Sequence, residues 1–268
     1  MDRAAYLRRI GYDGPLTASA DTLRALHEAH VFTVPFENLD IHLGRPISLD
    51  LPVLYDKIVR GCRGGYCFEL NGLFAWLVES IGFTIDHLMA RVRWGQTAPG
   101  PRSHRVLLVS LGGQRWIADV GFGGNGLIAS LPLIPNRVDA QYAERFRVMR
   151  EPDGEYRLDC EVRHVWEPLY SFTLASHLPV DYTYANYYHS HAPASLFTQT
   201  RLCTKPTPEG RLILRDRAFH TRAQGQTQVR TLDDAEAYRQ VPEAQFGVSL
   251  LLAEIHRWYT PAAPGGSE

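Results

Sequence analysis

The spacing of hydrophobic residues changes along this chain and divides it into three parts. In the first third, apolar positions recur at helical spacing, which predicts helices over residues 22–30 and 51–60. Pro35 lies between them and interrupts the pattern, because proline ends or displaces a helix. A further helix is expected from Cys67 to about residue 81, where Gly82 is a natural terminator.

The middle third has shorter apolar runs, which are typical of strands. The runs 105–111 and 114–120 flank Gly112 and Gly113, a pair that favours a hairpin turn. More short strands are expected beyond this hairpin, at residues 146–149, 156–158 and 166–170. Together they indicate a small antiparallel sheet or barrel.

The last third has a mixed pattern. Strands are predicted at residues 196–199 and 211–214, and a closing helix is predicted at residues 248–258. The pattern thus gives a helical part, a β part and a mixed part in that order.

Cys67 is the residue with the clearest chemical context. It follows Gly64 and Gly65, which allow a tight turn, and precedes an apolar run at helical spacing. We therefore place it at the first turn of a helix, where unpaired N–H groups and the helix dipole favour a thiolate. A thiolate is a nucleophile, and it needs a base and a residue that orients the base.

His104 and Asp119 are the candidates for these two roles. His104 opens the strand before the Gly112-Gly113 turn, and Asp119 closes the strand after it, so a hairpin would bring them together. Asp119 has apolar neighbours in the sequence, and a carboxylate in such a setting needs a partner such as an imidazole N–H. The three residues together indicate a Cys-His-Asp triad.

Two other interpretations of these residues stay open at this point. Most cysteines are small buried hydrophobic residues, and eleven histidines supply chance candidates for a base. A zinc site formed by Cys62, Cys67 and a histidine is the second alternative. The spacing of the two cysteines is wider than usual, and no second cysteine pair follows.

Composition and charge exclude several classes of protein. The 268 residues are 45% hydrophobic and 21% charged, which is ordinary for a soluble globular protein. The net charge of −1 predicts no attraction to nucleic acid or membrane. The first residues lack the apolar region of a signal peptide, and no apolar run is long enough to span a bilayer. Four cysteines in a chain of this length predict no disulfide scaffold, so a cytoplasmic location is expected.

Five stretches in this order resemble those of the arylamine N-acetyltransferases. They are residues 6–12, 34–40, 63–71 around Cys67, 103–109 around His104, and 118–123 around Asp119. The stretch around Cys67 is similar to the nucleophile motif of that family and is highly specific. Residues 197–199 with 203–210 match more loosely. The resemblance extends over nearly the whole chain.

The resemblance implies an α+β fold and an activity. It implies a helical domain at residues 1–84, a β-barrel domain at 85–192 and an α/β lid at 193–268. It also implies ping-pong transfer of an acetyl group from acetyl-CoA to arylamines, arylhydrazines or hydrazides, a role in xenobiotic metabolism, and no permanently bound cofactor. Transglutaminase-like proteases share the Cys-His-Asp core, so the triad alone does not name the reaction.

The resemblance also extends to residues beside the triad. It places Phe122 in the slot for the acceptor, with Val92 and Trp94 as weaker candidates, although ordinary core packing would explain Phe122 equally well. Gly121, Gly123 and Gly124 would leave room for the pantetheine arm of the acyl donor, or they form a turn that needs positive φ.

Three residues near the motif suggest a structural role. Glu37, Arg9 and Arg63 are expected to form a charge cluster that supports the turn before Cys67, with a solvated face as the alternative. Three classes of function remain open: an acyltransferase, a cysteine hydrolase or amidase, and a non-catalytic scaffold.

Overall fold

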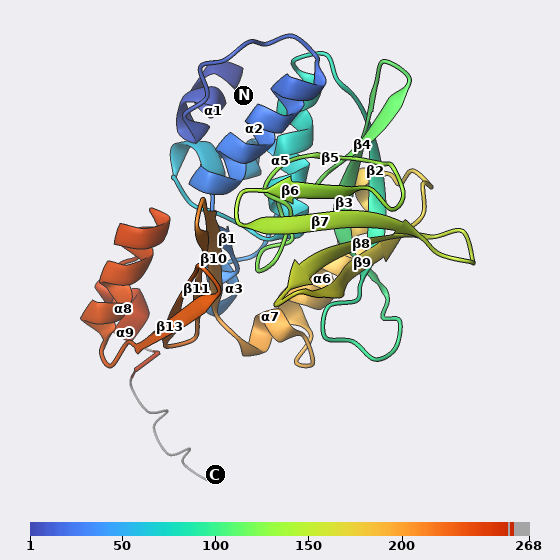
Figure 1. Cartoon of the computed structure of the whole chain (residues 1–268). Helices are drawn as coiled ribbons and strands as arrows, with labels where there is room; N and C mark the ends of the chain where they lie inside the picture. Colours follow the sequence, from blue (N-terminus) through green and yellow to red (C-terminus); the bar gives the residue numbers. More distant parts are fainter. Residues whose placement is uncertain (257, 260–268) are drawn as a thin grey trace.

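A computed structural model describes residues 1–256 and 258–259. Helices from the first part of the chain pack against a large antiparallel sheet, and a smaller sheet with its own helices follows (Figure 1). This arrangement confirms the predicted α+β fold. The predicted domain boundaries stay a prediction.

The first part of the chain is helical, as predicted, apart from one short strand, β1 (Phe36–Glu37). Ser19 starts the second helix by accepting a hydrogen bond from the backbone N–H of Thr22 at 3.2 Å. Pro52 lies in the first turn of the fourth helix, where proline is tolerated. The helices are α1 (Arg3–Ile10), α2 (Ala20–Thr33), α3 (Leu39–His42), α4 (Leu51–Tyr55), the π-helical turn η1 (Asp56–Arg60) and α5 (Cys67–Glu79).

The larger sheet has eight strands in the order β5-β4-β3-β2-β9-β8-β7-β6 and curls into a barrel-like layer (Figure 1). The predicted hairpin is present, with Leu107 paired to Ala118 and Leu111 paired to Gln114. Gly112 and Gly113 have φ of 56° and 78°, the combination that a two-residue type I′ turn requires. The strands are β2 (Thr84–Val92), β3 (Arg102–Leu111), β4 (Gln114–Ala118), β5 (Leu131–Pro132), β6 (Val138–Gln141), β7 (Glu144–Arg150), β8 (Tyr156–Val162) and β9 (Val165–Phe172).

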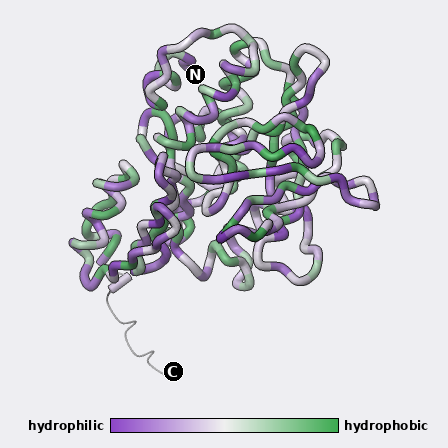
Figure 2. Tube along the Cα trace, viewed as in Figure 1, coloured by the Kyte–Doolittle hydropathy of each residue, from purple (hydrophilic) through white to green (hydrophobic). Residues whose placement is uncertain are grey.

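Helix α5 lies at the centre of the main hydrophobic core. Eleven of its residues are buried, and their apolar side chains share one cluster with residues of α1, α2 and β3. A helix that is apolar on nearly all sides must be enclosed by other elements. Strand β7, which lies between β8 and β6, is in contrast coloured largely hydrophilic (Figure 2). Within the described residues, no helix is long and apolar enough to cross a membrane.

The last part of the chain builds a five-stranded sheet in the order β1-β10-β11-β12-β13, so strand β1 from the N-terminal part forms one of its edges. Its strands are β10 (Leu202–Thr207), β11 (Gly210–Arg215), β12 (Ala218–Ala223) and β13 (Gln226–Thr231). Its helical segments and those that precede it are η2 (Pro179–Asp181), α6 (Tyr182–His191), α7 (Leu196–Gln199), α8 (Ala235–Val241), the π-helical turn η3 (Pro242–Phe246) and α9 (Leu252–His256).

Two predictions for this last part need correction. Residues 196–199 form helix α7 and not a strand, because Ser195 caps the turn and Asn38 binds the carbonyl oxygen of Phe197 at 2.8 Å. The closing helix starts at Leu252 and not at residue 248, because Val248 and Leu250 are buried in the C-terminal core in a non-helical segment. Residue 257, within the predicted helix, lies outside the described residues.

Candidate functional site

Cys67 is the first residue of α5, as the sequence predicts. Tyr66 precedes it in an extended conformation, and its backbone N–H donates to the Glu69 carboxylate at 2.9 Å. Gly64 is needed here for space, because a Cβ at that position would lie 2.0 Å from the carbonyl oxygen of Pro35. The turn therefore holds the buried Cys67 side chain at the positive end of the helix.

A cluster of buried charges lies next to this turn. Lys57 binds the carboxylates of Glu69 and Asp40 at 2.7 and 2.8 Å, and Arg63 binds Glu37 and Asp40 at 2.7 and 2.9 Å. Burial alone would lower the pKa of Lys57, but the surrounding carboxylates outweigh it and raise that pKa. Because every charge here has a partner, the cluster fixes the turn that carries the nucleophile.

Arg9 supports the same segment in a different way from the other cations. Its guanidinium donates to the carbonyl oxygens of Ile58 and Cys62, at 3.0 and 3.1 Å. Of the three residues expected in the charge cluster, Glu37 and Arg63 form an ion pair. Arg9 instead binds backbone carbonyl oxygens in the segment between α4 and Cys67.

His104 and Asp119 are brought together by the hairpin. His104 Nε2 lies 2.7 Å from Asp119 Oδ2, and both side chains are buried. Burial by itself lowers the pKa of His104, but the Asp119 carboxylate and the Cys67 side chain outweigh it and raise that pKa to about 10. These neighbours therefore favour the cationic form of the imidazole. Because Nε2 binds Asp119, Nδ1 is the ring nitrogen that can exchange a proton with Cys67.

Asp119 is held by more than its histidine. Its Oδ1 accepts hydrogen bonds from the Asn71 side chain at 2.8 Å and from the backbone N–H of Gly121 at 3.0 Å. Burial raises the pKa of Asp119, but His104, Asn71 and Gly121 together lower it below its usual value. Asn71 lies one helical turn after Cys67, in the stretch whose sequence we singled out, but nothing in that stretch indicated this role.

Phe122 lies beside the histidine, and Val92 lies opposite Tyr170, another neighbour of that histidine. The Phe122 ring meets the His104 ring edge-on at 5.2 Å, and both rings contact Tyr170, at 5.4 and 5.1 Å. Val92 is paired with Tyr170 across β2 and β9. Phe122 as a whole is only partly buried. Tyr170 was not expected from the sequence, because no local motif marks it.

The three glycines of the loop after Asp119 have different surroundings. A Cβ on Gly121 would lie 2.8 Å from the Cα of Cys67, and one on Gly123 would lie 2.7 Å from the Phe36 ring. These two glycines allow close packing inside the protein. A Cβ on Gly124 would meet no atom within 4 Å, and the Gly124 N–H donates to the Thr204 hydroxyl at 3.1 Å. Gly123 and Gly124 have φ of 69° and 36°, so the alternative of a turn that needs positive φ holds for these two.

The remaining cysteines do not join the site. Cys62 is exposed on the surface, whereas Cys160 and Cys203 are buried in two hydrophobic clusters that differ from the cluster of Cys67. Burial raises the pKa of the Cys160 thiol to about 12. Across residues 1–256 and 258–259, no three histidine, cysteine or acidic side chains come close enough to hold a metal, so the zinc alternative gains no support.

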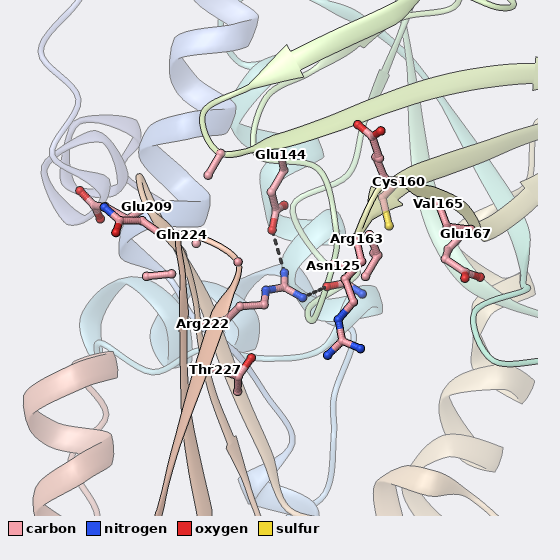
Figure 3. Close-up of a pocket in the computed structure, with 16 residues that line it drawn as sticks. Asn125, Glu144, Cys160, Arg163, Val165, Glu167, Glu209, Arg222, Gln224 and Thr227 are labelled. Carbon is pink, nitrogen blue, oxygen red and sulfur yellow. Dashed lines mark hydrogen bonds and ion pairs between the residues drawn. The ribbon is translucent and has the colours of Figure 1, made fainter.

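Two cavities lie near the loop that follows Asp119. The larger, of about 700 Å³, separates the barrel from the β11–β13 sheet, and Arg222 reaches across it to Glu144 and Asn125 (Figure 3). None of the triad residues lines it. The smaller, of about 20 Å³, borders Asp119, Phe122 and Gly123.

Comparison with known proteins matches nearly the whole chain. A family model described as N-acetyltransferase matches residues 19–255. The arylamine N-acetyltransferase of Escherichia coli (strain K12) is 37% identical over 248 residues, which cover 91% of this chain and 88% of that protein. A Salmonella typhimurium protein named arylamine N-acetyltransferase / N-hydroxyarylamine O-acetyltransferase is 38% identical over 259 residues, covering 92% and 88% of the two chains.

Solved structures agree with this match. The arylamine N-acetyltransferase from Salmonella typhimurium superimposes with a TM-score of 0.90 at 33% identity, covering 96% of this chain and 97% of that one. The Mycobacterium marinum enzyme, solved in complex with CoA, gives a TM-score of 0.90 at 30% identity and covers 96% and 98% of the two chains.

Proposed function

The chain belongs to the arylamine N-acetyltransferase family, and from this premise we propose that it moves an acetyl group from acetyl-CoA to an aromatic amine or hydrazide through an acetyl-cysteine at Cys67. The observation that carries the proposal is the position of Cys67 at the start of α5, beside an imidazole that Asp119 binds at 2.7 Å. A nucleophile, a base and a residue that orients the base are the parts that acyl transfer requires.

In the first half-reaction, the Cys67 thiolate attacks the carbonyl carbon of the thioester. A bond forms between that carbon and Sγ, and the bond to the CoA sulfur breaks. The His104 imidazolium gives its proton to the departing CoA thiolate, which leaves as the thiol. The backbone N–H groups of Glu69 and Leu70 both donate to the carbonyl oxygen of Tyr66, so those of Cys67 and Phe68, at the very start of α5, are the ones suited to stabilise the oxyanion.

In the second half-reaction, the amine nitrogen attacks the acetyl-cysteine. Neutral His104 accepts the proton that the amine loses, and Cys67 leaves as the thiolate, so the starting ion pair is restored. Asp119 holds the imidazole in one orientation through both steps. Burial of Asp119 and His104 supports this role, because a low local dielectric strengthens the interaction between their charges.

We assign the acceptor to the side of Phe122 and Val92. Phe122 is only partly buried and its ring lies beside His104, so it is placed for a flat aromatic amine to stack on it. For the pantetheine arm, Gly124 is the glycine with open space, whereas Gly121 and Gly123 face protein atoms. The four free cysteines agree with a cytoplasmic location for this activity.

Intact-mass analysis tests the proposal. Incubation with acetyl-CoA in the absence of an acceptor should add one acetyl group, which is lost in Cys67→Ala and kept in Cys62→Ser. Addition of an arylamine should remove the acetyl group and yield the acetylated amine. Steady release of acetate without an amine would identify a hydrolase instead, and an acetyl group that survives Cys67→Ala would contradict the role of Cys67.

A further inference from the structure

His27 lies in α2, far along the sequence from the triad, and its side chain is completely buried. Its Nε2 lies 3.1 Å from the backbone nitrogen of Asp119, 92 residues away. Its Nδ1 lies 2.9 Å from the carbonyl oxygen of Ile128. Both ring nitrogens are therefore engaged by the segment that carries the triad carboxylate.

The geometry dictates the protonation state of this ring. A backbone N–H only donates, so Nε2 must accept from Asp119 and must carry no proton. Nδ1 then carries the single proton and donates it to Ile128. Burial lowers the pKa of His27 to about 4, which keeps the ring neutral. The charged or titratable groups that face it are Asp119, Arg24 and His30.

The backbone needs such a partner at this position. Strand β4 ends at Ala118, so the sheet no longer supplies hydrogen bonds from residue 119 onward. Three successive N–H groups are then bound by side chains: Asp119 by His27, Val120 by the Asn71 amide oxygen at 2.9 Å, and Gly121 by Asp119 itself. A buried N–H without a partner is strongly unfavourable, so these side chains set the path of the chain.

His27 also touches the helix of the nucleophile. Its ring meets Phe74 of α5 edge-on, with centroids 5.9 Å apart. The loop between its two hydrogen-bonding partners, residues 119–128, carries both Asp119 and Phe122. One neutral ring thus joins α2, α5 and both ends of the loop beside the triad.

We propose that His27 is a positioning residue of this enzyme: by accepting the Asp119 N–H, it aims the Asp119 carboxylate at His104, and by donating to Ile128 it fixes the far end of the loop that carries Phe122. This inference rests on the proposed role of Cys67, His104 and Asp119. His27 does not touch the reacting atoms, and it acts through Asp119.

Two substitutions of His27 test its two hydrogen bonds one at a time. Glutamine can place its amide near the position of Nε2 and keep the bond to Asp119, whereas asparagine reaches only the position of Nδ1 and keeps the bond to Ile128. We expect His27→Asn to slow acetylation of Cys67 roughly tenfold to a hundredfold, the effect of one lost buried hydrogen bond. His27→Gln should stay within about threefold of the wild type in this step.

Alkylation of Cys67 by iodoacetamide as a function of pH supplies a readout that core packing alone would not move. His27→Asn should shift the pH profile, because a misdirected carboxylate holds the His104 imidazolium less well, and His27→Gln should keep the profile. Equal effects of both variants on rate, with unchanged alkylation profiles, would show that His27 only fills the core. Because alkylation needs no acetyl-CoA, the outcome is independent of whether the wild type forms acetyl-Cys67.

Nitrogen NMR shifts of the His27 ring in the wild-type protein test the premise without any substitution. The Nδ1–H tautomer is expected. An Nε2–H tautomer would overturn the proposal, because that nitrogen could then not accept a hydrogen bond from Asp119, whatever the stability of the variants.

Discussion

Asn71 donates a hydrogen bond from its side-chain amide to Asp119 across 2.8 Å, so the helix that begins with the nucleophile also holds the carboxylate of the triad. The same amide group donates to the carbonyl oxygen of Arg105 at 2.7 Å, next to His104. Helix α5 and the β3–β4 hairpin are therefore locked together at the site.

Asp119→Asn should nearly abolish acetylation of Cys67 while the fold stays intact. The amide oxygen can still accept from Asn71 and Gly121, but the amide nitrogen would face His104 Nε2, so the imidazole loses both its orientation and its counter-charge. We expect a loss on the order of 10⁴-fold in the acetylation rate, measured by rapid-quench mass analysis. A loss of less than tenfold would show that Asp119 is not needed to orient His104.

The stability of the protein should fall in alkaline solution because of His104. Its pKa rises from 6.5 to about 10 on folding, so its contribution to stability is fully present below pH 6.5 and is lost as the pH rises through about 10. The contribution is at most roughly 5 kcal/mol. Urea unfolding of the wild type and His104→Gln, compared across this range, should show a steeper decline for the wild type. Parallel curves would contradict the raised pKa.

Gly121→Ala should damage both stability and acetylation. The added Cβ would lie 2.8 Å from the Cα of Cys67 and 2.9 Å from the Asn71 amide nitrogen, so α5 or the loop must move. Overpacking of this kind typically destabilises by about 1–3 kcal/mol. Gly100→Ala is a matched control, because nothing lies within 4 Å of its Cβ position. The free energy of unfolding and the acetylation rate should change in the first variant and not in the second.

Phe122→Ala should reduce the preference for aromatic acceptors. Stacking of an aryl ring on Phe122 contributes roughly 0.5–1.5 kcal/mol beyond the area buried, and this contribution is absent for alkyl amines of equal basicity. Pre-steady-state deacetylation of acetyl-Cys67 against a matched amine series measures the difference. Phe122→Leu controls for the contact with His104, because it keeps an apolar side chain there. Damage mainly to the acetylation step would move Phe122 to the donor side or to the core.

Removal of the Arg63 charge should strongly destabilise the fold. Arg63→Met would leave the fully buried Glu37 without its ion-pair partner at 2.7 Å, and loss of one member of a buried pair costs about 3–5 kcal/mol. Arg60→Met is the matched control, because its pair with Asp56 is exposed and should change the stability by less than about 1 kcal/mol. Chemical unfolding that gives equal values for both variants would contradict a supporting role of the cluster.

The sequence predicted those parts of the site that are formed by residues close together along the chain. The turn before Cys67 follows from two glycines, and the contact between His104 and Asp119 follows from a hairpin whose Gly112-Gly113 turn fixes its register. The strand predicted at residues 196–199 was wrong, because a four-residue segment is decided by its cap and by Asn38, which is distant in sequence. His27 and Tyr170 were missed for the same reason. Their roles depend on contacts between segments that are distant in sequence, and the spacing of residues along the chain does not indicate such contacts.

The pairing of β1 with β10 also affects when, during synthesis of the chain, the surroundings of the nucleophile can form. Phe36 and Glu37 pair with Thr204 and Cys203, and the backbone N–H of Glu37 binds the carbonyl oxygen of Gly65, two residues before Cys67. A nascent chain that has not yet reached Cys203 lacks half of this strand pair. Because non-local strand pairs of this kind slow folding, the segment beside the turn before Cys67 cannot complete its hydrogen bonds until the chain has been made through Thr204.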